Sequence, residues 1–255
     1  MEGIEVKREI DEKSIYEIHI INIKNISDEF SKVIDKYFVR ICEGNSESNI
    51  NVVKKRVLKF LESKSDETRI GAIAEFFIHL YLNNLNYKQE CRFLNLEEGS
   101  IKKGFDGYYS NSAEEWIMES KSGFNKTKGI SHKNKILEAY KDLEDKIKGD
   151  TKNNPWMNAY NHACHRDINT NESIVKHMKG LADDFVLDKF YDIKDFNIIP
   201  CATIFLDGTW IDNDINKIFS DVQESIKILK YKKIITICCT KISVQAFIEY
   251  LSKVS

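Results

Sequence analysis

Residues 198–206 and 234–240 are almost continuously apolar and rich in isoleucine. Short runs of this kind, without polar alternation, are typical of β-strands that are covered on both faces. Helical patterns surround them, at about 172–190, at about 213–229 and from about 243 onward. We therefore expect an α/β fold in which helices flank a central mixed sheet.

Length and composition favour a single folded unit. The chain has 255 residues and 42% apolar content, enough for a sizeable core, and no internal repeat or low-complexity tract divides it. We expect one domain over 1–255, with an accessory N-terminal region (1–65), a catalytic core (66–147) and a remainder (148–255) that holds an insertion near 148–190. In the accessory region the patterns predict a strand at 15–23 and helices at about 28–42 and 50–62.

The N-terminus carries charged residues where a signal peptide would need an apolar stretch, and no run approaches a membrane span. We therefore expect a cytoplasmic protein with no membrane partner. The six cysteines show no CxxC spacing and several lie in apolar runs, which predicts reduced, buried side chains. They are Cys42, Cys91, Cys164, Cys201, Cys238 and Cys239.

A helix that is apolar almost all round is predicted for residues 70–82, where only Glu75 and His79 are strongly polar. Ser65 or Asp66 would be its N-cap. Glu75 lies off the main apolar stripe, where an unpaired carboxylate would be costly to desolvate. It needs a cation nearby, such as a metal or a lysine, unless it lies at a partly solvated edge of the helix. The pattern leaves both interpretations open.

Two later strands are expected to pair as an antiparallel hairpin. The first, at 103–109, contains Asp106, the second closes with Glu119 and Lys121, and a short polar link joins them. Because alternate side chains of a strand share a face, Glu119 and Lys121 should emerge together. The hairpin would then bring Asp106 beside Glu119.

Two carboxylates beside a lysine suit metal-assisted hydrolysis of a phosphodiester. Mg²⁺ or Mn²⁺ prefers oxygen ligands and Mg²⁺ usually keeps several waters, so one or two carboxylates suffice. Asp106 and Glu119 would be ligands, with the carbonyl of Ser120 as a third oxygen. Lys121 would orient or deprotonate the attacking water, or neutralise the phosphate. Since an ammonium beside carboxylates ordinarily stays protonated, the orienting and electrostatic roles are favoured over the base role, unless burial lowers the pKa of Lys121.

These elements together resemble the PD-(D/E)XK nuclease superfamily. They follow in order as a helix with Glu75, a strand near 87–94, the strand with Asp106, the strand with Glu119-x-Lys121 and a helix at about 132–147. The resemblance implies a restriction-endonuclease-like core in which Asp106 and Glu119 bind metal. Lys121 would assist the hydrolytic water, and Glu75 would complete the metal site. Phe105 stands where the motif's name has a proline, a departure that the superfamily commonly tolerates.

Residues 69–75, 104–108 and 116–121 look more specifically like the HamA family, the nuclease subunits of Hachiman antiphage defence systems. That likeness implies a bacterial effector that degrades DNA in a heteromeric complex with a HamB-like helicase. A catalytically inactive nucleic-acid-binding or assembly subunit with the same fold is the alternative. An enzyme on an unrelated fold is disfavoured, because the chain has no glycine-rich phosphate loop and no nucleophile elbow.

A net charge of −2 excludes a surface that is basic all over, so any DNA-binding patch must be local. The best candidate is the segment 121–135, which has five lysines and no acidic residue. Ser131 would cap the helix that follows, so phosphates would meet lysines and backbone amides together. A solvated loop with incidental lysines is the alternative, disfavoured by the adjacent carboxylates. The predicted DNA contacts are Lys126, Lys128, His132, Lys133 and Lys135.

A cluster of His162, Cys164 and His165 follows a strong break at 148–155 and invites a zinc interpretation. The cluster has neither a second paired half nor a recognised spacing. A packed insertion is therefore favoured over structural zinc, with a substrate or partner contact also open.

Overall fold

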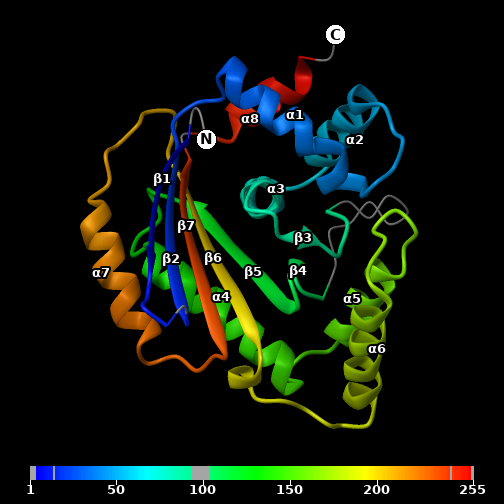
Figure 1. Ribbon diagram of the computed structural model, residues 1–255. Helices are drawn as coiled ribbons and strands as arrows, with labels where there is room; N and C mark the ends of the chain where they lie inside the picture. Colours follow the sequence, from blue (N-terminus) through cyan, green and yellow to red (C-terminus); the bar gives the residue numbers. More distant parts are fainter. Residues whose placement is uncertain (1–3, 14, 94–103, 242, 254–255) are drawn as a thin grey trace.

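The computed structural model describes residues 4–13, 15–93, 104–241 and 243–253, which form a seven-stranded mixed sheet flanked by helices (Figure 1). The strands are β1 (Ile4–Ile10), β2 (Tyr16–Ile23), β3 (Lys88–Gln89), β4 (Gly107–Asn111), β5 (Glu114–Phe124), β6 (Asn197–Phe205) and β7 (Lys233–Lys241). In space they lie in the order β1-β2-β7-β6-β5-β4-β3. The four central strands, β2, β7, β6 and β5, are parallel, whereas β1, β4 and β3 pair antiparallel to their neighbours.

The two apolar runs form the middle of this sheet, as predicted. Every residue of β6 is buried, as are eight of the nine residues of β7. The pairing of β6 with β7 skips Ile199 and Pro200, at the point where proline has no amide N–H to donate. β6 nevertheless continues through Pro200, because its other edge pairs without interruption with β5.

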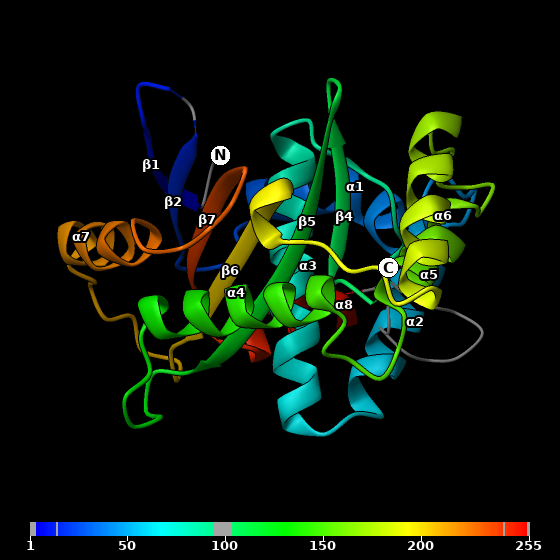
Figure 2. The same cartoon turned by 90° about the horizontal axis from the view of Figure 1, so that it is seen from below.

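Helices cover both faces of the sheet, giving three layers (Figure 2). One layer contains α1 (Asp28–Glu43), α2 (Ile50–Glu62), α3 (Asp66–Asn84) and α8 (Gln245–Ser252). The other contains α4 (His132–Lys148), α5 (Pro155–Ala163), α6 (Glu172–Val186), the 3₁₀ turn η1 (Ile193–Asp195) and α7 (Ile215–Ile226). No helix in the described ranges is long and apolar enough to cross a membrane.

The N-terminal region contains the predicted strand and both predicted helices, but it is less separate from the core than expected. β2 pairs in parallel with β7, so it belongs to the centre of the sheet. β1, which was not predicted, alternates partly buried Ile4 and Val6 with exposed residues and forms one edge of the sheet. The charged residues of β1 suit an edge that must not pair with another chain.

Local sequence signals set the ends of the two helices that face β5. Ser65 caps α3 by accepting a hydrogen bond from the amide of Thr68, and Ser131 caps α4 by accepting from Asn134. α4 ends at Gly149, which adopts the left-handed conformation that a residue with a Cβ disfavours. The break predicted at 148–155 is therefore present, and α5 begins at Pro155.

α5 packs against the loop that leads into β4. The ring of Trp156 meets that of Phe105 edge-on, with centroids 4.8 Å apart. Gly104 has φ +76°, and a Cβ at this position would lie 2.4 Å from the carbonyl oxygen of Pro155. The glycine thus allows the loop and the start of α5 to approach backbone to backbone.

We expect Gly104→Ala to destabilise the protein by more than about 2 kcal/mol, because the methyl group adds a backbone clash to an unfavourable φ. Gly129→Ala is the matched control, since Gly129 has φ +77° but nothing within 4 Å of the position that a methyl group would take. That variant should lose only about 1 kcal/mol. Urea denaturation of both variants measures the difference, and equal losses would contradict the close packing of Gly104.

Candidate active site

The predicted hairpin places Asp106 beside Glu119. β4 and β5 pair antiparallel, with Gly107 opposite Met118, so the next position along brings Asp106 to Glu119. The carboxylate of Asp106 accepts a hydrogen bond from the amide of Ser120, 2.9 Å away. The connecting turn is shorter than expected, because the strands continue to Asn111 and Glu114. The start of the predicted first strand, at position 103, lies outside the described residues.

Glu119 is a buried carboxylate that faces α4 between two lysines. Its side chain is only 4% exposed. Lys146 of α4 donates to Oε2 at 2.5 Å, and Nζ of Lys121 lies 3.5 Å from Oε1. Each carboxylate oxygen therefore has an ammonium beside it, which compensates much of the cost of burying the charge.

Burial and the nearby charge of Asp106 raise the pKa of Glu119 to about 7, although Lys146 and Lys121 act in the opposite direction. Two negative charges repel each other strongly where water is excluded, so Asp106 and Glu119 together attract cations. A buried carboxylate with a raised pKa, held beside a second carboxylate, is typical of functional sites.

Lys121 is held between two acidic side chains, Glu119 on its own strand and Asp142 on α4. Burial lowers the pKa of Lys121, but Glu119 and Asp142 outweigh that effect and raise it above its usual value. The ammonium therefore stays protonated, which favours the orienting and electrostatic roles over the role of a base.

Asp142 and Lys146 belong to the site, and the sequence analysis missed both. Two residues along a strand span about 6.6 Å and four residues along a helix span about 6 Å. Glu119 and Lys121 on β5 can therefore face Lys146 and Asp142 on α4 in register, with the helix running against the strand. An Asp-x-x-x-Lys spacing in the helix after Glu-x-Lys was the available signal, but the sequence alone does not show which helix face meets the strand.

Glu75 lies in the opposite layer. It is half-buried on α3, which packs on the face of β5 that carries Trp116 and Met118. Its charge, like that of Asp106, helps to raise the pKa of the buried Tyr109 hydroxyl, chiefly raised by burial itself. Glu75 and Asp106 thus both lie close enough to Tyr109 to act on its pKa.

The carboxylate ligands suit a hard divalent cation that retains several bound waters. They suit a metal site closed entirely by protein ligands less well. Within the described ranges no three histidine, cysteine, aspartate or glutamate side chains are grouped closely enough to hold a metal by themselves. Asp106 and Glu119 supply carboxylate oxygens at adjacent positions of paired strands. Mg²⁺ accepts one or two carboxylates together with waters and substrate oxygens, so this pair fits it.

The basic segment contains exposed lysines, partly buried lysines and a buried histidine. Lys126 and Lys128 are exposed, Lys126 with an ion pair to Asp207, and Lys135 pairs with Glu138 at 2.7 Å. Among the described residues, neither Lys128 nor Lys133 forms an ion pair. These lysines remain available for the phosphate contacts that the sequence predicts.

His132 does not match the predicted DNA contact. It is only 6% exposed, and its Nε2 lies 3.2 Å from the carbonyl oxygen of Cys239 and 3.3 Å from Oγ1 of Thr240. Burial lowers the pKa of His132 to about 4, so the ring is neutral at pH 7. The pattern of the segment could not show that the first residue of α4 points inward.

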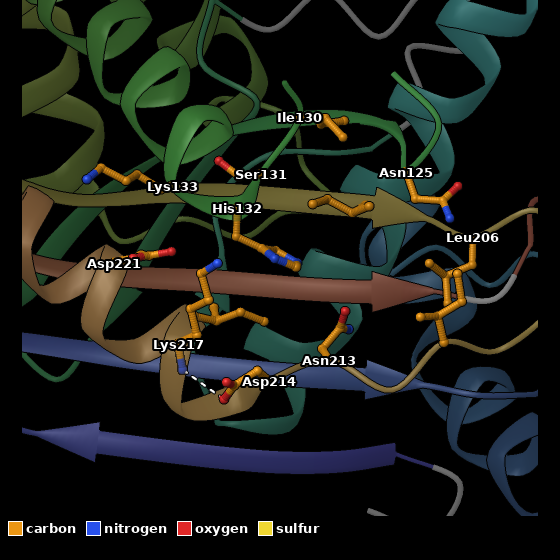
Figure 3. Close-up of a pocket in the computed structure, with 13 residues that line it drawn as sticks. Asn125, Ile130, Ser131, His132, Lys133, Leu206, Asn213, Asp214, Lys217 and Asp221 are labelled. Carbon is orange, nitrogen blue, oxygen red and sulfur yellow. Dashed lines mark hydrogen bonds between the residues drawn. The ribbon is translucent and has the colours of Figure 1, made fainter. Parts of the chain in front are cut away.

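A pocket of about 300 Å³ lies at the start of α4, between this helix, the end of β6 and the start of α7 (Figure 3). Lys133 and Lys217 line it, but so do Asp214 and Asp221. Because its charges are mixed, the pocket gives no preference for an anionic ligand.

The zinc interpretation finds no support in the described residues. His162 is buried and Cys164 is exposed, and His165 approaches Asp167 at 3.7 Å. All six cysteines lie in the described ranges, and none of them forms a disulfide. Five are buried, so the expectation of burial is wrong only for Cys164.

No family model matches the chain, and no curated protein matches it significantly.

We expect stability to depend on pH through His132. Its folded-state pKa lies below its unfolded value of about 6.5, so the unfolded chain binds the extra proton first as the pH falls. The stabilisation of the folded state that comes from keeping His132 neutral is complete above pH 6.5. It is lost as the pH falls toward 4, by up to about 3 kcal/mol. Urea denaturation at pH 7 and pH 4.5 should show a smaller loss for His132→Gln than for the wild type. The partly exposed His165→Gln control should behave as wild type; an unchanged pH dependence in His132→Gln would refute this assignment.

Proposed function

We propose that this chain is a metal-dependent DNA nuclease of the PD-(D/E)XK type. The observation that carries the proposal is the convergence of Asp106, Glu119 and Lys121 where β4 meets β5. The order of α3, β3, β4, β5 and α4 supports it, because it is the order that the resemblance implies.

Asp106 and Glu119 would hold Mg²⁺ or Mn²⁺, and Glu75 of α3 would complete the acidic set, as the resemblance implies. When bound, the divalent ion would offset the charge that develops on the phosphate and make a water more acidic. Asp106 is oriented for this by the amide of Ser120. Glu119 is oriented by Lys121 and, in this structure, is also contacted by Lys146.

Lys121 would stabilise negative charge on the scissile phosphate. It remains protonated, and Asp142 restrains its side chain from the helix side. A cation that is already positioned needs little reorganisation as charge develops, which is the usual origin of electrostatic rate enhancement.

DNA would run from this site along α4 toward the basic segment. Asp142 lies ten residues after the start of α4, which corresponds to about 15 Å along the helix. Lys126, Lys128, Lys133 and Lys135 would therefore contact phosphates several nucleotides from the one that is cut, and would position the backbone without reading its sequence.

A role as an antiphage effector controlled by a helicase subunit is the finer part of the proposal. Its support is the likeness of the segments around Glu75, Asp106 and Glu119 to the HamA family. An inactive binding subunit is the alternative that the cleavage experiment separates from it.

Plasmid degradation tests the proposal. With Mg²⁺ or Mn²⁺ the wild type should cleave, and chelator should abolish cleavage. We expect Glu119→Gln and Lys121→Ala each to lose at least about a hundredfold in rate, because each removes charge at the reaction centre. Glu172→Gln, at an exposed carboxylate of α6, should cleave as the wild type does.

Circular dichroism should accompany these assays, to show that the variants are folded. DNA binding without cleavage by the wild type, with either metal and with or without a cognate helicase, would favour the inactive subunit. Equal cleavage by all variants would exclude the assigned site.

A further inference from the structure

Lys146 occupies the side of Glu119 that a bound cation would need. Its ammonium lies 2.5 Å from Oε2, while Lys121 lies near Oε1. Because Glu119 is almost fully buried, any further cation that approached its carboxylate would meet two ammonium groups at short range. Such a cation would be repelled unless one ammonium withdrew.

We propose that Lys146 is a positioning residue that competes with the divalent cation for Glu119, an inference that rests on the proposed function. In the metal-free protein Lys146 neutralises and orients the buried carboxylate. When the cation binds, Lys146 withdraws toward solvent and leaves Glu119 free to act as a ligand.

Lys146 is better placed to withdraw than Lys121. It lies in the last turn of α4, and its side chain is about as exposed as that of Lys121, 20% against 22%. Besides its bond to Glu119, it approaches the ring of Phe105 at 6.0 Å, a distance at which the attraction is weak. Lys121 is held by Glu119 on one side and by Asp142 on the other. A flexible four-carbon stem lets a lysine such as Lys146 change direction at little cost.

Charge balance favours this exchange. Apart from Glu75 in the opposite layer, three carboxylates, from Asp106, Glu119 and Asp142, share the site with the ammoniums of Lys121 and Lys146. With Lys146 withdrawn, a divalent cation and Lys121 together balance the three carboxylates. With Lys146 retained, the site would carry an excess positive charge. The exchange therefore ends in a neutral cluster, which a buried site tolerates best.

The competition lowers the apparent metal affinity, because the cation binds only the fraction of molecules in which Glu119 is open. The site would then be loaded, and active, only when enough metal is present to displace Lys146.

Calorimetric titration of the full chain with Mn²⁺ tests the inference. We expect Lys146→Met to bind Mn²⁺ roughly tenfold more tightly than wild type, because the competing charge is gone. Lys146→Arg retains the charge and should bind far less tightly than Lys146→Met. Lys148→Met, which alters an exposed lysine paired with Glu144, should bind as the wild type does.

Thermal unfolding with and without Mn²⁺ gives a second measurement that does not depend on activity. Added Mn²⁺ should raise the melting temperature of Lys146→Met more than that of the wild type, and should restore the fold if the variant is unfolded without metal. A Lys146→Met protein that binds Mn²⁺ equally or more weakly, or that stays unfolded with Mn²⁺, overturns the inference while wild-type cleavage leaves the proposed function intact. Failure of every protein, including wild type, to bind Mn²⁺ or Mg²⁺ would overturn both.

Discussion

The rest of the candidate site depends on the ion pairs made by the buried carboxylate of Glu119. An isolated charge in this position would cost several kcal/mol, so the surrounding elements must supply cations. β5 supplies Lys121 from the same face of the strand, and α4 supplies Lys146 from across the layer. Asp142 then restrains Lys121. The position of α4 over β5 is therefore set by paired charges as well as by the apolar contacts of Ile136 and Leu143.

The parallel centre of the sheet gives this arrangement its rigidity. β5 pairs with β6 over its last nine residues, and Glu119 and Lys121 stand opposite Pro200 and Ala202. Both neighbours are buried, and Pro200 in particular restricts the backbone beside Glu119. A charged pair on such a strand keeps its spacing, whereas the same pair on a loop would not, which is a requirement for a preorganised site.

The sequence predicted those parts of the site that depend on local patterns. Alternation along β5 placed Glu119 with Lys121, and hairpin pairing brought Asp106 to them. The strand near 87–94 was overestimated: β3 comprises only Lys88–Gln89, and position 94 lies outside the described residues. Contacts between layers were not predictable in the same way. Lys146 joins the site, and His132 is buried, because of how α4 is rotated on the sheet, and helical periodicity does not specify which polar residues meet a strand.

The inserted segment has a structural role that its histidines and cysteine did not indicate: α5 packs against the loop that leads into β4. Trp156 of α5 lies between the rings of Phe105 and Phe196, with centroids 4.8 and 5.3 Å away. Phe105 directly precedes Asp106, so docking of α5 fixes the loop from which that carboxylate projects. The β4–β5 pairing places Asp106 beside Glu119, and residues about fifty positions later in the chain pack against the loop that carries Asp106. This makes α5 part of the support of the site rather than an appendage to it.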